Sequence, residues 1–205
     1  MRNAEFGIVN LPKAVSVFSG AEPEVWSECG VDWDGAPVDP PVRYQFSLYD
    51  EAFCFRTSRE CAAVLHPEAV AGKFQEELWK YEVAEFFLSH PSNGSYLEVN
   101  LAPNGAWWSC LFSAPRVPMH EEAKPLSQVK VEANYTDDRW ETSWSVPLDV
   151  LKKTVVGFGE GWGLNATFIV DFPQQRFLTA CPLGSGEPDF HRPEAFLPLH
   201  FVSDG

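Results

Sequence analysis

The stretch EVAEFFLSHPSNGSYLEVNLAPNGAWWSCLF, residues 82–112, decides the fold, because it predicts three consecutive strands. The expected strands cover residues 82–88, 96–101 and 107–112. In the second strand, Leu97, Val99 and Leu101 fall on one face, and Glu98 and Asn100 fall on the other. A meander of this kind buries one face of the sheet and leaves the other with groups that can form hydrogen bonds.

The turn before the third strand decides which of two adjacent tryptophans faces the core. Pro103 suits the second position of a type I turn, with Gly105 in the left-handed region as a bulge. That register places Trp108 beside Asn100 on the polar face and sends Trp107 to the core. A two-residue turn would swap the two rings, but Pro103 disfavours it because proline removes a ladder donor.

The whole chain predicts an all-β fold. About ten or eleven short strands, spaced near ten residues apart, indicate an antiparallel β-sandwich with one or two short helices. We expect the helical turns at 147–151 and 193–196, and an opening hairpin or edge strand within 1–20. The acidic, proline-rich residues 21–42 predict an irregular loop. A length of 205 residues fits a single domain over 1–205.

Composition limits the possible partners. The net charge of −14 disfavours nucleic acid and anionic membranes, whose binding needs clustered Lys and Arg, and it permits a cation or a neutral polar ligand. The five cysteines form no CxxC pair, which favours reduced, mostly buried thiols. No apolar run reaches a membrane span and no leader is visible, so we expect a soluble, cytoplasmic protein; a secreted form whose leader has been removed stays open.

Polar residues of the meander are the first candidates for a binding site. Glu85 shares a strand face with Val83 and Phe87, where a carboxylate is costly unless it is paired or hydrogen-bonded. It is either an acceptor in the floor of a pocket or a surface group near the sheet edge. Asn100 can donate to and accept from a pair of sugar hydroxyls, but with Glu98 it also fits an exposed sheet face.

Catalytic and metal motifs are weak in this sequence. No GxSxG occurs, and a glycosidase pair assembled from Glu85 and Glu98 has no fixed separation, so we expect no catalytic residue. We expect no cofactor either; calcium bound by acidic residues within 32–39 is conceivable, although no EF-hand spacing supports it. The segment Gly157–Gly163 lacks the lysine-serine ending of a phosphate loop, and it predicts a long flexible loop that presents Trp162.

Five segments together resemble a known family. In chain order they are EVAEFFL, YLEVNLAPNGAWW, WETSWSVPLDVL, GWGLNATF and DFHRPEAFLPLHF. They resemble the family 9 carbohydrate-binding modules and the DOMON-like domains related to them, over roughly residues 43–202. The resemblance implies a β-sandwich that binds sugars without catalysis, between two aromatic side chains.

The resemblance also implies ligand-binding positions in this chain. One aromatic position, just before the closing Pro-x-x-Phe turn, matches Phe190, and the nearest match to the other is Trp79. Glu85 matches the strand glutamate. Asn100 and Asn165 match the polar strand positions, and Arg192 is placed to reach ligand hydroxyls. Trp108, which the turn argument places on the polar face, completes the expected set.

Three functions follow from these observations. The leading one is a non-catalytic, DOMON-like carbohydrate-binding domain that holds a mono- or oligosaccharide by aromatic stacking and hydrogen bonds. The second is a structural or interaction domain that keeps the fold but has lost its ligand, with a pocket filled by its own side chains, chiefly Phe190 and Trp162. The third is a glycoside-processing enzyme that depends on Glu85.

Overall fold

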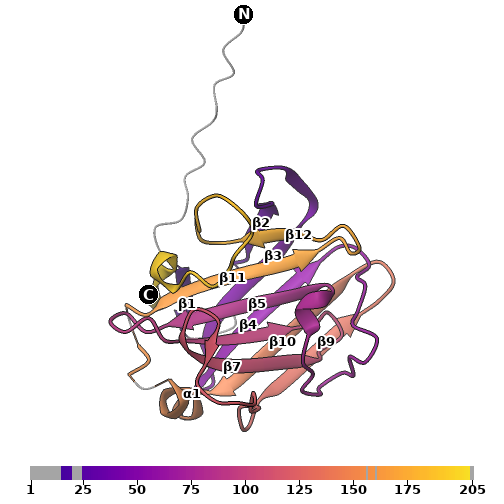
Figure 1. The fold of residues 1–205 in the computed structure, drawn as a ribbon. Coiled ribbons are helices and arrows are strands. Elements are labelled where there is room, and N and C mark those ends of the chain that lie inside the picture. The colour runs from indigo at the N-terminus through magenta and orange to yellow at the C-terminus, as the bar shows by residue number, and fades with distance from the viewer. Residues whose placement is uncertain (1–14, 20–24, 156, 160, 204–205) are drawn as a thin grey trace, which may run out of the picture.

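The protein is a β-sandwich of two sheet layers (Figure 1). The computed structural model describes residues 15–19, 25–155, 157–159 and 161–203. Its strands are β1 (Val15–Ser19), β2 (Ser27–Val31), β3 (Pro37–Tyr49), β4 (Ala52–Arg59), β5 (Val83–Ser89), β6 (Tyr96–Leu101), β7 (Trp107–Ala114), β8 (Val117–Pro118), β9 (Lys130–Tyr135), β10 (Trp140–Pro147), β11 (Gly163–Val170), β12 (Arg176–Thr179) and β13 (Leu197–Ser203). The helices are α1 (Leu148–Thr154) and the 3₁₀ turns η1 (Leu78–Lys80) and η2 (Pro193–Ala195).

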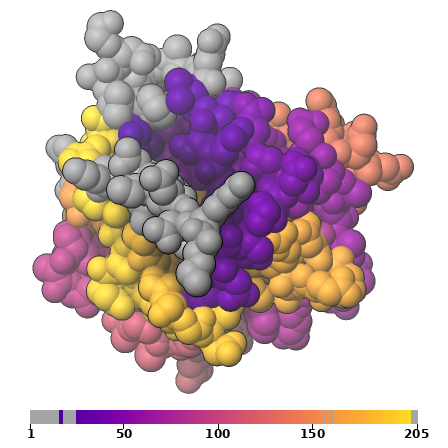
Figure 2. All heavy atoms as spheres, turned by 90° about the horizontal axis from the view of Figure 1, so that it is seen from above, coloured from indigo at the N-terminus to yellow at the C-terminus, as the bar shows by residue number. Residues whose placement is uncertain are grey.

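The two layers are joined through β13. One layer has the strand order β8-β7-β6-β5-β11, with β12 added beside β11, and the other has the order β1-β3-β4-β10-β9, with β2 added beside β3. Strand β13 pairs with β11 on one side and with β1 on the other. The two ends of the described chain are therefore neighbours, and Figure 2 shows indigo N-terminal and yellow C-terminal atoms side by side.

The main core lies between the layers, where alternate residues of each strand meet. Strand β10 shows the pattern most clearly, because every second side chain is buried from Trp140 to Val146. Phe86 of β5 reaches across the layers to Phe55 of β4 and Trp144 of β10, with ring centroids 5.2 and 5.3 Å apart. Full burial of one such ring contributes about 1.5–3 kcal/mol, so these contacts hold the sheets face to face.

The structure differs from the sequence prediction in several elements. The described residues form thirteen strands rather than ten or eleven, because β2 lies in the stretch 21–42 that we expected to be an irregular loop and the short β8 follows β7. Strand β3 also begins earlier than expected, at Pro37. Strand β1 is not an edge strand, since it pairs with β13 and β3, and both pairings are parallel in an otherwise antiparallel fold. The other half of the expected opening hairpin, residues 6–9, lies outside the described residues.

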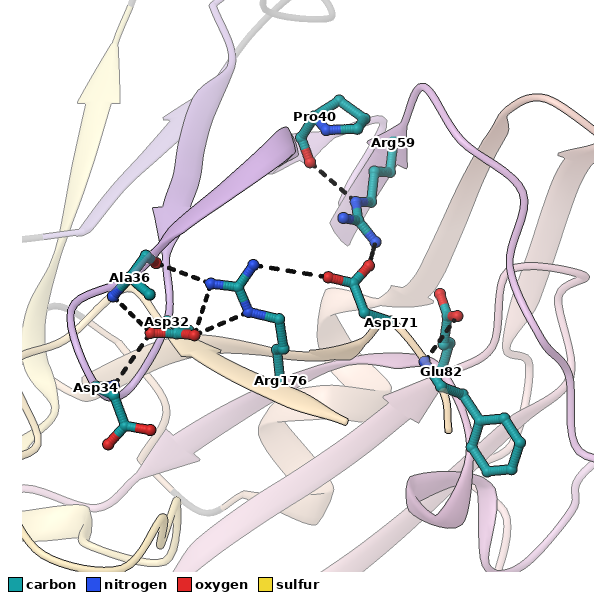
Figure 3. A network of polar contacts seen from close by, with 9 residues as sticks. Asp32, Asp34, Ala36, Pro40, Arg59, Glu82, Asp171 and Arg176 are labelled. Carbon is teal, nitrogen blue, oxygen red and sulfur yellow. Dashed lines mark hydrogen bonds and ion pairs between the residues drawn. The ribbon is translucent and has the colours of Figure 1, made fainter. Parts of the chain in front are cut away.

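A network of charged groups ties the layers together at one end (Figure 3). The buried Arg59 guanidinium, at the end of β4, donates from Nη1 to Asp171 Oδ1 at 2.7 Å and from Nε to the Pro40 carbonyl at 2.9 Å. Arg176 of β12 donates from Nε and Nη2 to Asp32 Oδ2 at 2.8 and 2.6 Å. These contacts connect the β2–β3 loop and β4 with both strands at the far edge of the other layer.

Candidate functional site

The outer face of the β5–β7 layer carries an open cavity of about 560 Å³. Strands β5, β6, β7, β11 and β12 supply its floor, and the loops before β5, after β7 and before η2 supply its walls. Its lining includes Glu76, Glu77, Trp79, Glu85, Glu98, Trp108, Cys110, Phe112, Arg116, Pro118, His120, Glu121, Ala123, Ile169, Phe177, Pro188, Phe190 and His191. The polar face of the meander is therefore the base of a binding-sized depression.

Strand register brings the polar residues of the floor together. Glu85 of β5 lies opposite Asn100 of β6 and Thr167 of β11, and Asn100 lies opposite Trp108 of β7. Glu98 stands two residues before Asn100 and therefore shares its face. Because β5 is an interior strand and Glu85 is only 3% exposed, it is not a surface group at a sheet edge. Glu98 and Asn100 are also buried, so the expectation of an exposed sheet face is wrong.

Burial changes the acidity of the two floor carboxyls. Desolvation raises the pKa of Glu85 to about 7, although the hydrogen bond from the Thr167 hydroxyl to Glu85 Oε2, at 2.9 Å, opposes the change. Desolvation and the charge of Glu85 raise the pKa of Glu98 well above its usual range. Two carboxyls that share a buried site do not both ionise readily, so near neutral pH the pair retains a proton.

Three polar atoms around the floor have no hydrogen-bond partner among the described residues. They are Glu98 Oε2, Asn100 Oδ1 and Trp108 Nε1, and each is shielded from water by the surrounding protein. Buried polar atoms are normally paired, because leaving one unpaired costs about 1–3 kcal/mol. Two unpaired acceptors and one unpaired donor beside a cavity are therefore the pattern expected of groups that a ligand satisfies.

His191 contributes a neutral ring to the wall of the cavity. The Tyr96 hydroxyl lies 2.7 Å from His191 Nδ1 and accepts a hydrogen bond from the Arg116 backbone N–H at 3.1 Å. The hydroxyl and Nδ1 therefore share one hydrogen bond, and the Arg116 N–H holds the hydroxyl in place beside the ring. Burial, and then the charge of Arg116, lowers the pKa of His191 to about 4, so the ring is uncharged at neutral pH.

Aromatic rings supply the apolar part of the lining. Trp79, just after the start of η1, is 51% exposed, and the Lys80 ammonium lies 5.7 Å from its ring centroid. Phe190 is buried against Trp33 and Phe177, each with a centroid separation of 6.1 Å. One exposed indole and one fixed phenyl ring therefore belong to different walls of the same cavity.

The placement of Trp108 confirms the turn argument made from the sequence. The Gly105 N–H donates to the Ala102 carbonyl at 2.8 Å, and Gly105 has φ of 86°. Trp107 pairs with Leu101 and lies in the core, whereas Trp108 pairs with Asn100 and lines the cavity. The type I turn with its glycine bulge thus sets which ring reaches the site.

Of the seven residues expected to bind ligand, four line the cavity and a fifth completes its floor. Trp79, Glu85, Trp108 and Phe190 belong to the lining, and Asn100 lies beneath it. Their roles in binding stay predictions.

The other two expected residues lie outside the lining. Asn165 is fully buried, where its amide bonds to the Thr179 hydroxyl and accepts from the Cys181 N–H. Arg192 donates to the Leu183 carbonyl at 2.6 Å and stacks over Trp33, so its guanidinium holds a loop rather than facing the cavity. Both side chains therefore form hydrogen bonds with other groups of the protein rather than pointing into the cavity.

Sequence reasoning missed His191 and Arg116 as parts of the site. His191 adjoins Phe190, which the sequence did single out, but its partner Tyr96 is 95 residues away. The sequence also suggested that Trp162 is presented on a loop. Trp162 is instead 3% exposed in the core, and its Nε1 donates to the Gly157 carbonyl.

Two kinds of feature, metal-ligand clusters and long apolar helices, were not found in the described part of the chain. No group of three or more His, Cys, Asp or Glu side chains there is arranged to hold a metal ion. The Asp32 carboxylate, considered for calcium, is already bonded to Arg176. None of the helices within the described ranges has the length and apolar character that a bilayer span requires.

A family model and two relatives from other organisms match most of this chain. The model of carbohydrate-binding family 9 matches residues 24–201. The UPF0462 protein C4orf33 homolog of Mus musculus is 31% identical over 182 residues, which cover 82% of this chain and 88% of that protein. The UPF0462 protein C4orf33 of Homo sapiens is 30% identical over 181 residues, covering 82% and 84%.

Solved structures confirm the sandwich. A crystal structure from Bacteroides uniformis has a TM-score of 0.65 and 19% identity, and the match covers 93% of this chain and 99% of that one. A family 9 carbohydrate-binding module from Caldicellulosiruptor kristjanssonii, in complex with cellotriose, has a TM-score of 0.61 and 10% identity, covering 93% and 94%.

Proposed function

The chain belongs to carbohydrate-binding family 9, a family of non-catalytic binding modules, and from this membership we propose that its cavity holds a mono- or oligosaccharide. It shares a family with the UPF0462 proteins as well. The observation that carries the proposal is the coincidence of unpaired polar atoms with aromatic walls in one open cavity. Sugars present hydroxyls that donate and accept, and they also present apolar C–H faces.

Aromatic stacking is the proposed apolar contact. A pyranose face laid on the exposed ring of Trp79 would remove apolar surface from water on both partners. At about 25 cal/mol per Å², covering ~60 Å² contributes about 1.5 kcal/mol, which corresponds to roughly tenfold in affinity. Trp108 and Phe190 line the same cavity and would bound the ligand on other sides.

Polar contacts are proposed to select the hydroxyl pattern. Asn100 Oδ1 and Glu98 Oε2 are acceptors for sugar hydroxyls, and Trp108 Nε1 is a donor. The excess of 29 Asp and Glu over 15 Lys and Arg supports a neutral or cationic ligand rather than nucleic acid or an anionic membrane. The sugar-bound structure of the Caldicellulosiruptor module lends the proposal further support.

The alternative function is a domain that keeps the fold but has lost its ligand, and it predicts a pocket filled by the protein's own side chains. Phe190 and Trp162 were the side chains expected to fill it. Trp162 lies in the core, and Phe190 lines a cavity of about 560 Å³. An unfilled cavity with unpaired polar atoms favours binding.

Calorimetry and tryptophan fluorescence test the proposal with glucose, cellotriose and a wider glycan panel. We expect a blue shift on binding, because a ligand excludes water from Trp79 and Trp108. The Trp79→Ala variant should weaken affinity about tenfold by the area argument above. The matched control is Trp26→Ala, which removes another partly exposed indole, one that contacts Arg43 and Arg56 instead of the cavity.

Two results would contradict the proposal. Absence of binding across the panel at millimolar sugar would favour the domain that has lost its ligand. Turnover of chromogenic glycosides that disappears in the Glu85→Gln variant would identify an enzyme.

A further inference from the structure

The lining of the cavity is strongly acidic. It contains five glutamates, Glu76, Glu77, Glu85, Glu98 and Glu121, and one arginine, Arg116. The Arg116 guanidinium already donates to Asp189 at 2.8 Å, and Lys80 near the rim is paired with Glu77 at 2.6 Å. Neither cation forms an ion pair with a floor carboxyl, although the charge of Arg116 acts on Glu98 from a distance.

The two floor carboxyls lack a directly bonded cation. Glu98 is 5% exposed, and its Oε2 has no hydrogen-bond partner among the described residues. The basic atom that approaches it is His191 Nδ1 at 3.8 Å, but burial lowers the pKa of His191 to about 4, so the ring brings no positive charge at neutral pH. The titratable and charged groups that influence Glu98 are Glu85 on β5, Tyr96 on β6, Cys110 on β7, and His191 and Arg116 from loops.

A neutral sugar leaves this charge arrangement unresolved. Hydroxyl donors stabilise a single carboxylate, yet the second carboxyl still has to keep a proton because no counter-charge enters the site. An ammonium group has three donors and one positive charge. It can satisfy Glu98 Oε2 and Asn100 Oδ1 while allowing both carboxyls to ionise.

The aromatic walls suit the same chemistry. Trp79, Trp108 and Phe112 line the cavity beside the carboxyls. The faces of such rings attract cations, most strongly where water is excluded. The apolar lining therefore adds to the attraction for an ammonium group and still offers a surface for a pyranose ring.

We propose that the ligand of this cavity is an amino sugar, whose ammonium group takes its place between Glu85 and Glu98. The inference rests on the proposed function, because it names the class of carbohydrate that the same site prefers.

A pair of matched trisaccharides tests the preference. Cellotriose and the β-1,4-linked trimer of glucosamine share a backbone and differ in the amine that replaces the 2-hydroxyl. By calorimetry at pH 6.5, we expect the glucosamine trimer to bind at least tenfold tighter. Titrations in two buffers of different ionisation enthalpy should show proton release with the amine and none with cellotriose. The trimer of N-acetylglucosamine, which lacks the charge, should not exceed cellotriose.

The Glu98→Gln variant tests whether the preference for the glucosamine trimer arises at the cavity floor. Glu98→Gln keeps the shape of the side chain and removes its charge, so the ratio of the two affinities should fall to near one. The control is Glu132→Gln, which removes an exposed carboxylate on β9 outside this cavity and should leave the ratio unchanged. If Glu98→Gln does not fold, the affinities of the two trisaccharides for the unmodified protein still test the proposed preference.

The outcomes separate this inference from the proposed function. Equal affinity for cellotriose and the glucosamine trimer, or no proton release, would overturn the amino-sugar preference and leave sugar binding standing. Failure of both trisaccharides to bind at millimolar concentration would overturn the two together.

Discussion

Glu85 carries a carboxyl group in the middle of a sheet, where the Thr167 hydroxyl at 2.9 Å is its hydrogen-bond donor. A single neutral donor does not replace the water that an ionised carboxylate loses on burial. The group is therefore more easily ionised in the unfolded chain than in the folded protein. Folding and the affinity of the site for protons are linked at this residue.

The pH dependence of stability should reveal this linkage. Since the pKa of Glu85 is raised from 4.5 to about 7, the folded state holds a proton between these values that the unfolded state has lost. Stability therefore falls as pH rises through this window, by up to about 1.4 kcal/mol per pH unit and roughly 3 kcal/mol in all. We expect Glu85→Gln to match the unmodified protein near pH 4.5 and to be the more stable of the two above pH 7.

Urea unfolding at a series of pH values measures this difference. Glu132→Gln serves as the control, because its carboxylate is exposed on β9 and its removal should leave the shape of the pH profile unchanged. A constant difference between the Glu85→Gln variant and the unmodified protein from pH 4.5 to 8 would show that burial does not perturb this carboxyl.

At the scale of elements, the β6–β7 turn positions one wall of the cavity by docking against the other layer. The Thr142 hydroxyl of β10 donates to the Pro103 carbonyl at 2.9 Å, and the Gly72 N–H donates to the Gly105 carbonyl at 3.0 Å. A methyl group on Gly105 would lie 3.1 Å from side-chain carbons of Val131 and Ala133 in β9. The turn that sets the register of Trp108 thus has little free space around it.

Substitution of Gly105 should therefore cost more than its backbone conformation alone predicts. Gly105→Ala forces alanine to a φ of 86° and also crowds β9, so we expect a loss of about 2–3 kcal/mol in the free energy of unfolding. The matched control is Gly35→Ala, at a φ of 83° with no atom within 4 Å of the added methyl, which should cost about 1 kcal/mol. Equal losses in the two variants would show that the contact with β9 relaxes freely.

Elements built from local signals were predictable from the sequence. The period-two pattern of residues 96–101 and the chemistry of the turn at Pro103 and Gly105 gave the meander, its register and the side on which Trp108 lies. Each of these signals acts over a few residues. The helix expected from Pro147 onward also forms, as α1 over Leu148–Thr154.

Features that depend on distant partners were not predictable in this way. Asn165 and Arg192 lie outside the cavity lining, because each side chain has a partner elsewhere in the chain, the Thr179 hydroxyl of β12 or the Leu183 carbonyl of a loop. Parallel pairing of β1 with β13 joins segments at opposite ends of the chain. The position of His191 likewise depends on Tyr96, so its place in the cavity required the assembled fold.

At the scale of the whole molecule, the two layers are held by an apolar core and by the charged network at one end (Figure 3). Arg59 is central to that network, because its guanidinium contacts Asp171 at the end of β11 and the Pro40 carbonyl of β3 in different directions. Its side chain is 2% exposed, whereas the Asp171 side chain is 36% exposed. The layers are therefore clamped by an ion pair with one buried partner and one that reaches water.

Loss of Arg59 should weaken the clamp between the layers. Arg59→Met keeps most of the side-chain volume but leaves the Asp171 carboxylate and the Pro40 carbonyl without this donor. We expect a loss of about 3 kcal/mol, at the low end for a broken buried pair because Asp171 keeps contact with water. Arg59→Lys should recover little, since a single ammonium does not reproduce two donors that point in different directions. Lys153→Met, which breaks an exposed pair with Asp149 at 2.8 Å, is the control and should leave the urea midpoint unchanged. If Arg59→Met unfolds at the same urea concentration as this control, the apolar core alone holds the layers together.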